Sequence, residues 1–396
     1  MLTRSDKWTR LSAVGHGFFS AASIFKLAVY SSNLIQDWVN GTQPDSLEKI
    51  PDNTTLYVGC ILMTFATGAL YSQMALNAFH ERQAVHNILR SPILVRPSTE
   101  HSPHAEFTSG DEGEDYGNGN AYDYRQTFLR TTPTSHLTII QKMALGAEFA
   151  AEAGAISNAL IAGTVLFKQL VLKQSLTLIG NIPLAIGSTI FGALGAIANV
   201  RNCKHAMSDG TEGNLLEHFK ADRLTNIAAV GESLVSALNI FSWVANWAEL
   251  IMELASGTQK NTDTMSDLSL YLGCAFMLLS LGAFYSHRKL NAYHQYRELQ
   301  DPEGMPLSCL QKTALGAEAI SHTAKISNAI TTGADLLGKT VLPGVLPSWG
   351  KLLLKCSATV FAAASAAAPV RNCEDAIHSQ NTDTYLNSRR TGSSVN

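Results

Sequence analysis

Residues 57–80 read YVGCILMTFATGALYSQMALNAFH, and a related stretch, YLGCAFMLLSLGAFYSHRKLNAYH, occupies residues 271–294. The two stretches are identical at 12 of 24 positions. A second pair, QKMALGAEFAAEAGAISNAL at 141–160 and QKTALGAEAISHTAKISNAI at 311–330, is identical at 11 of 20 positions. Repetition on this scale predicts that one structural unit occurs twice in the chain and that the two copies pack against each other.

The repeat divides the chain into a first unit at 1–210 and a second unit at 211–380, and we expect residues 381–396 to form a flexible C-terminal tail. Each unit contains four long apolar segments that end at Pro, Gly or Asn positions. Alternating β-branched runs, which are typical of strands, are missing from the sequence. We therefore predict an all-α protein of about eight long helices in two tandem repeats. Because each unit has an even number of helices, we expect parallel repeats related by a pseudo-two-fold axis.

The first unit carries a polar insertion at about 91–135, between its second and third helices. The offset between matching residue numbers falls from 214 at residue 57 to 170 at residue 141, so the insertion adds 44 residues. Its centre reads HSPHAEFTSGDEGEDYGNGNAYDY. Such a composition buries too little apolar surface to offset the entropy lost on ordering, so we expect a disordered loop that is open to protein partners.

Three segments lack Asp, Glu, Lys and Arg over 19 residues or more: 54–79, 174–200 and 268–286. About 20 apolar residues are enough to span a bilayer. Charged residues make up only 15% of the chain, against roughly 25% in typical soluble domains. We therefore predict a multi-pass integral membrane protein in contact with lipids. A soluble all-α bundle with unusually apolar helices is the alternative.

The placement of basic residues predicts an orientation for the membrane protein. If eight helices span the bilayer, 20 of the 29 Lys and Arg residues, including all 14 Arg, fall on the side that holds both termini. Cytosolic loops of membrane proteins carry an excess of this kind. The N- and C-termini are therefore predicted to be cytosolic.

Several function classes are disfavoured by the sequence. The net charge of −3 provides no basic footprint, so no nucleic-acid partner is expected. Phosphate-binding glycine loops, nucleophile motifs and zinc motifs are missing, so we expect no enzyme activity, catalytic residue, cofactor or metal site. His80 and His294 have no partner at ligand spacing, and we interpret them as polar residues at helix ends.

The repeated ALGAE…ISN block carries small residues at a spacing of 3-4-3-4. Small residues at this spacing form a flat helix face on which two backbones approach closely. This small-residue face comprises Ala144, Ala147, Ala151, Gly154 and Asn158 in the first unit and Ala314, Ala317, Ser321, Ala324 and Asn328 in the second. We interpret the face as a packing surface.

Two pairs of charged residues recur at matching positions of the units. Glu148 and Glu318 lie near the predicted starts of their helices, where a carboxylate favours the helix dipole. The alternative is that they are intramembrane carboxylates that bind a proton or a cation. Arg201 and Arg371 follow long apolar runs in the repeated sequence VRNC. We predict that these arginines anchor the helix ends at the lipid headgroups.

Long uncharged helical segments such as 54–79 and 174–200, combined with a Gly-, Ser- and acid-rich insertion, resemble the inclusion-membrane and effector proteins of intracellular bacteria such as chlamydiae. Our first hypothesis for the function is a structural or protein-interaction role in a membrane, with the insertion presented to partners, and the resemblance implies a bacterial effector inserted in that membrane.

A transporter or channel with its path between the units is the second hypothesis, and a soluble helical scaffold is the third. His16 of the first unit aligns with Glu232 of the second, and Glu152 likewise aligns with His322. Because both pairs change chemical type, they disfavour a symmetric transport path.

Overall fold

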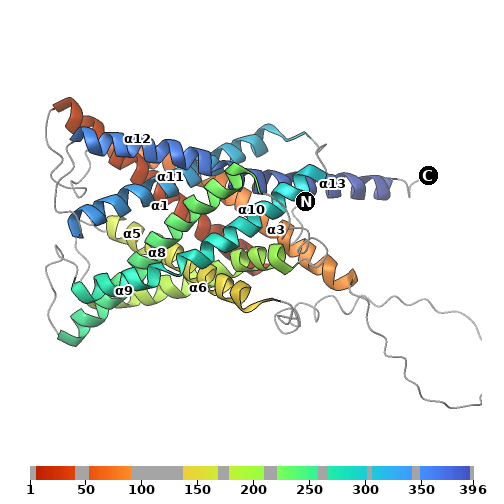
Figure 1. The fold of residues 1–396 in the computed structure, drawn as a ribbon. Coiled ribbons are helices and arrows are strands. Elements are labelled where there is room, and N and C mark those ends of the chain that lie inside the picture. Colours follow the sequence, from red (N-terminus) through yellow and green to blue (C-terminus); the bar gives the residue numbers. More distant parts are fainter. Residues whose placement is uncertain are drawn as a thin grey trace, which may run out of the picture.

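The structure, a computed structural model of the whole chain, describes residues 6–40, 53–90, 137–167, 178–208, 221–256, 266–300, 306–340 and 348–392. Every regular element in these ranges is an α-helix (Figure 1), which confirms the predicted all-α class. The predicted disorder of the insertion at about 91–135 lies outside the described residues.

Eight long helical rods make up the described part of the chain. Five rods are continuous: α1 (Lys7–Asn40), α5 (Ile139–Phe167), α6 (Leu178–Ser208), α8 (Arg223–Ser256) and α11 (Cys309–Thr340). Three rods consist of two helices joined end to end: α2 (Asn53–Met63) with α3 (Ala66–Arg90), α9 (Asp267–Met277) with α10 (Ser280–Gln300), and α12 (Ser348–Ser365) with α13 (Ala367–Gly392). The prediction of about eight long helices is confirmed.

The breaks within the three paired rods have local causes. At the α2–α3 joint, Phe65 N–H donates to the Leu62 carbonyl at 3.1 Å, and at the α9–α10 joint Leu279 N–H donates to the Phe276 carbonyl at 3.0 Å. Hydrogen bonds to the third preceding residue tighten a helix locally. The α12–α13 joint precedes Pro369, which has no N–H to donate to the carbonyl one turn earlier.

The two helices that carry the ALGAE block begin with the same capping arrangement. In α5, Gln141 N–H donates to Thr138 Oγ1 at 3.2 Å, and Thr138 N–H donates to Gln141 Oε1 at 2.8 Å. In α11, Ser308 and Gln311 make the same two hydrogen bonds, at 3.3 and 2.9 Å. Reciprocal hydrogen bonds of this kind satisfy backbone donors that the first turn of a helix leaves open. The start of each helix is therefore specified locally.

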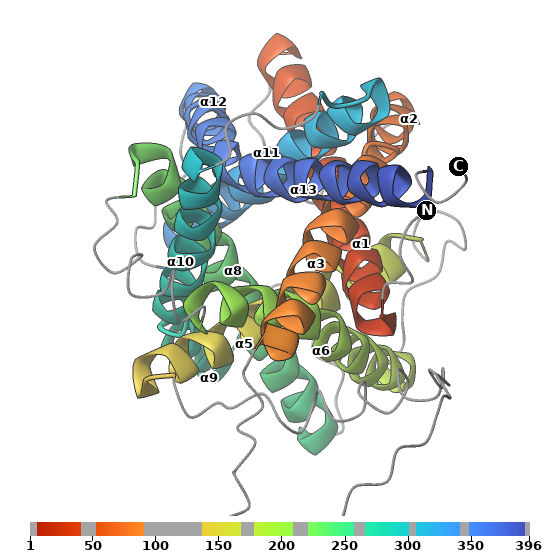
Figure 2. The same ribbon diagram turned by 90° about the vertical axis from the view of Figure 1, so that its right-hand side faces the viewer.

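The rods run side by side, each antiparallel to the one before it, so that α1 begins and α13 ends at the same end of the bundle (Figures 1 and 2). α13 continues to Gly392, and Arg82 of α3 holds it through an ion pair with Asp383 at 2.9 Å. The chain is therefore helical over most of 381–396, where the sequence led us to expect a flexible tail. Residues 393–396 lie outside the described ranges.

Helices from the two sequence units pack across each other: α3 contacts α11, and α10 contacts α5. A Cβ atom added at Gly68 would lie 2.5 Å from the Cβ of Ala317, and one added at Gly282 would lie 2.6 Å from the Cβ of Ala147. Nine residues of the small-residue face are buried, and the tenth, Asn158, is partly buried. The face therefore lies under neighbouring helices at close backbone distance.

Six of the rods are long and apolar enough to span a membrane: Lys7–Asn33, Leu56–Val85, Gly180–Ser208, Arg223–Ser256, Asp267–Gln300 and Gly350–Tyr385. The other two described rods are α5 and α11. These two carry most of the buried charged side chains described below.

Gly68→Ala and Gly282→Ala are each expected to lower the free energy of unfolding by about 1–3 kcal/mol, because the added methyl group overpacks the contact with the facing helix. Gly146→Ala in α5 is the matched control, since a Cβ there meets nothing within 4 Å. Its effect is expected to be neutral or stabilising, by up to about 1 kcal/mol, because Ala has the higher helix propensity. Denaturant unfolding in detergent micelles measures all three variants. Equal stabilities would contradict the close approach.

Candidate functional site: a buried cluster of carboxylates and histidines

A cavity of about 60 Å³ lies among α1, α3, α5, α6, α8, α10, α11 and α13. This volume has room for a few water molecules. The ionisable side chains that line it come from both sequence units: His16, Glu148, Glu152, Glu232, His287, His322 and Lys325. We call these residues, together with the adjacent Glu318, the central cluster.

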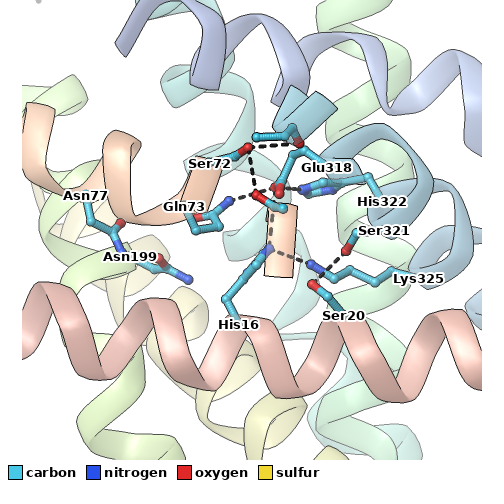
Figure 3. A network of polar contacts seen from close by, with 12 residues as sticks. His16, Ser20, Ser72, Gln73, Asn77, Asn199, Glu318, Ser321, His322 and Lys325 are labelled. Carbon is cyan, nitrogen blue, oxygen red and sulfur yellow. Dashed lines mark hydrogen bonds and ion pairs between the residues drawn. The ribbon is translucent and has the colours of Figure 1, made fainter. Parts of the chain in front are cut away.

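Glu318 is the centre of one half of the cluster, and its side chain is fully buried. One of its oxygens, Oε1, accepts a hydrogen bond from Gln73 Nε2 at 3.0 Å. The same oxygen lies 3.0 Å from His322 Nε2 and 3.4 Å from His16 Nε2 (Figure 3). Glu318 and His322 are one turn apart on α11, so they share a helix face.

His322 joins this half of the cluster to the other. Its Nδ1 lies 2.5 Å from Glu232 Oε1, while its Nε2 faces Glu318. Ionised carboxylates only accept hydrogen bonds, so both ring nitrogens can be satisfied only if both carry protons. The geometry therefore indicates an imidazolium bridge between two buried carboxylates.

Lys325 places a cation beside His16. Its Nζ lies 2.8 Å from His16 Nε2. A lysine ammonium only donates, so His16 Nε2 accepts and the ring is neutral. The ammonium also lies 4.9 Å from the centroid of the Phe19 ring, where it gains a cation–π attraction.

Glu148, Glu152 and His287 form the other half of the cluster. Glu148 and Glu152 are one turn apart on α5, and His287 Nε2 lies 3.3 Å from Glu148 Oε1. Each of the three residues offers one ligand atom, and these atoms lie within 4.8 Å of one another. His16, Glu318 and His322 form a second group with the same property. No metal site was predicted from the sequence, because the third member of each group comes from a different helix that is far away in the sequence.

The two halves occupy matching positions of the sequence repeat but differ in chemical type. Glu318 aligns with Glu148, but Gln73 aligns with His287. The exchange of His16 for Glu232, taken above as evidence against a symmetric path, has a structural consequence, because it brings Glu232 into contact with His322.

The charges of the central cluster do not balance. Four carboxylates are present: Glu148, Glu232 and Glu318 are buried, and Glu152 is partly buried. Lys325 and the bridging His322 contribute one positive charge each, and His16 is neutral. His287 can add at most one more. At least one negative charge therefore remains, and a buried charge of this kind is unfavourable unless a proton or a cation neutralises it.

A second buried polar group lies at the end of the bundle that holds the termini. Asp375 Oδ2 accepts a hydrogen bond from His294 Nδ1 at 2.7 Å. His294 Nε2 lies 3.1 Å from His80 Nε2, and His80 Nδ1 lies 3.0 Å from His205 Nδ1. Each of the three contacts needs one proton. With all three rings neutral, His205 Nδ1 donates to His80, His80 Nε2 donates to His294, and His294 Nδ1 donates to Asp375. We call these four residues the histidine chain.

The histidine chain corrects the interpretation of His80 and His294 as polar residues at helix ends. Both rings are fully buried, and α3 and α10 continue beyond them. The one available sequence signal was the recurrence of His at the same position of both units. The partners of the two rings, His205 and Asp375, are far away in the sequence and could not be assigned.

Arg201 and Arg371, predicted to be lipid anchors, make matching contacts within the protein. Arg201 donates to Asp6 Oδ2 at 3.1 Å and to the Asn77 carbonyl at 3.0 Å. Arg371 donates to Asp222 Oδ2 at 3.1 Å and to the Asn291 carbonyl at 3.3 Å. Each arginine thus ties together three helices.

The Asp222 carboxyl shows the electrostatic effect of these contacts. Burial acts to raise its pKa, but hydrogen bonds from Thr225 and the charge of Arg371 outweigh that effect, so its pKa lies below the usual value. The carboxylate therefore remains ionised opposite the arginine.

Comparisons with protein-family models, curated proteins and solved structures find no match to this chain. The resemblance to effector proteins of intracellular bacteria stays a prediction.

His322→Ala is expected to lower the free energy of unfolding by about 3–5 kcal/mol, because it leaves the carboxylates of Glu232 and Glu318 buried without their shared partner. Adding Glu232→Gln removes one orphaned charge, so the double variant is expected to recover part of the loss. Denaturant unfolding in micelles measures both variants. A His322→Ala stability within about 0.5 kcal/mol of wild type, or no recovery in the double variant, would contradict the bridge.

Proposed function

We propose that the protein is a multi-pass membrane protein that moves protons or cations through the cavity between its two units. The observation that carries this proposal is the convergence of four carboxylates on one interior cluster with an uncompensated negative charge. Ionisable groups inside a membrane protein are costly, and they commonly mark ion pathways and proton relays. The proposal corresponds to the second hypothesis from the sequence.

The surface of the bundle supports insertion into a membrane. Large apolar side chains are widely exposed on the described helices, among them Tyr57 at 71%, Ile61 at 66%, Tyr271 at 71% and Val360 at 72%. Monomeric soluble proteins rarely expose apolar surface on this scale. Lipid contact accounts for such a surface together with six helices of spanning length.

Recurring contacts support an arrangement of two tandem repeats about a pseudo-two-fold axis. Ser72 Oγ donates to the Ala314 carbonyl at 3.1 Å, and Ser286 Oγ donates to the Ala144 carbonyl, also at 3.1 Å. The two arginine networks are matched in the same way. Secondary transporters built from repeats bind their substrates at the repeat interface, near the middle of the membrane. The central cluster has the corresponding position between the units.

The histidine chain supports a role for protons in particular. Each of its rings can accept a proton at one nitrogen and release one from the other. The chain leads toward Asp375, whose side chain is 15% exposed, at the end of the bundle that we predict to be cytosolic. The structural or protein-interaction role depends on the insertion at about 91–135, outside the described residues.

Proton movement can be measured in lipid vesicles that contain the purified protein and a pH-sensitive dye, with an imposed membrane potential. Wild-type vesicles are expected to acidify faster than empty vesicles, because protons neutralise and cross the central cluster. Glu232→Gln and Glu318→Gln are expected to reduce the rate toward that of empty vesicles, while the packing control Gly146→Ala retains it. Wild-type rates equal to those of empty vesicles would exclude proton movement.

The predicted orientation can be tested by labelling single cysteines. Cys309 and Leu268 are exposed and lie in the first turns of α11 and α9, at opposite ends of the bundle. In a background without other cysteines, a membrane-impermeant thiol reagent added outside intact cells is expected to label Leu268→Cys and to leave Cys309 unlabelled. The cysteine-free background is the control. Labelling of both positions from the same side would contradict a spanning α9–α10 rod.

A further inference from the structure

The two halves of the central cluster differ in one positively charged side chain, that of Lys325. Lys325 lines the cavity in one half, with its ammonium group against His16. The sequence repeat places Ala155 at the matching position of the other half, and this residue also lines the cavity. The half around Glu148 therefore lacks an equivalent of the lysine, although it contains the larger share of the carboxylates.

Glu148, in this half, has a buried acceptor atom that no hydrogen bond uses. Its side chain is 1% exposed, and its Oε2 atom has no hydrogen-bond partner among the described residues. Glu152 and His287 each place a further ligand atom within 4.8 Å. A buried carboxylate oxygen without a donor is costly, and a bound cation would satisfy it.

We propose that a divalent first-row transition-metal ion, of the class of Zn²⁺ or Mn²⁺, binds at Glu148, Glu152 and His287. A mixed set of imidazole and carboxylate ligands suits such ions, whereas Ca²⁺ and Mg²⁺ prefer oxygen ligands alone. Three protein ligands leave a coordination position open, as in sites where the metal exchanges a ligand. The ion takes the place that the Lys325 ammonium has in the other half.

The other candidate group, His16, Glu318 and His322, is less suited to a metal. Both ring nitrogens of His322 face carboxylates, and His16 Nε2 accepts from Lys325. To bind a metal at this group, either His16 or His322 would have to give up one of these contacts. Glu318 Oε2, like Glu148 Oε2, has no partner among the described residues, so it is the engagement of the histidines that selects the site at Glu148.

The proposal deepens the proposed function, because it names the class of ion that the cavity accepts, and its role in transport depends on that function. Binding can be measured separately, on the purified full-length protein in detergent after chelator treatment. Titration with Zn²⁺ by calorimetry, and with Co²⁺ by visible absorption, is expected to show one site per chain. Glu148→Gln and His287→Gln are each expected to abolish it.

Ala155→Lys provides the sharpest variant, because it adds a tethered cation and removes no ligand. It is expected to abolish Zn²⁺ and Co²⁺ binding, whereas Ala155→Met, of similar length and without charge, retains binding. If Ala155→Lys does not fold, the Zn²⁺ affinities of Glu148→Gln and His287→Gln test the site instead. Unchanged Zn²⁺ affinity in Glu148→Gln and His287→Gln would overturn the proposal.

The outcomes for binding and for transport are distinguishable. Proton flux in vesicles without any Zn²⁺ or Co²⁺ binding would overturn the metal site and leave the proposed function standing. Zn²⁺ binding that is lost in Glu148→Gln and Ala155→Lys, in a protein that moves neither protons nor Zn²⁺, would support the metal site and overturn the proposed function.

Discussion

The gathering of three buried carboxylates and the partly buried Glu152 with too few positive partners is the constraint on which the rest of the structure depends. Interior charge is tolerated where hydrogen bonds and opposite charges compensate it. One oxygen of Glu318 meets this condition through Gln73 and the His322 bridge, whereas the matching oxygen of Glu148 has only His287 beside it, at 3.3 Å. The second oxygen of each glutamate has no hydrogen-bond partner among the described residues. The proposed movement of protons or cations rests on this imbalance.

Close helix packing places this cluster. Gly68 lets α3 approach Ala317 of α11, and Gln73, just over a turn further along α3, reaches Glu318. Gly282 has the same relation to Ala147, and His287, a similar distance further along α10, reaches Glu148. The small-residue face and the contacts of the ionisable residues therefore depend on the same two helix–helix interfaces. The small residues fix the distance between the helices, and the next turn supplies the polar contact across it.

Much of the fold could be predicted from the sequence, but little of the site could. Helix count and bounds follow from local patterns such as the repeated blocks and the Thr138 and Ser308 caps. The polar contacts join residues far apart in the chain, such as Glu232 with His322, and no local pattern encodes such pairs. The sequence does show the exchange of chemical type between aligned positions of the two units, but alone it argues only against a symmetric transport path. In three dimensions the exchange places acid beside base.

The most direct test of the account is the infrared spectrum of the metal-free protein in the carboxyl C=O stretching region. Because the cluster carries more carboxylates than positive charges, the account predicts a band from at least one protonated carboxyl group, and predicts that Glu148→Gln removes or shifts it. A wild-type spectrum without any protonated carboxyl band at neutral pH would mean that all four glutamates are ionised. That result would contradict the charge imbalance on which the account depends.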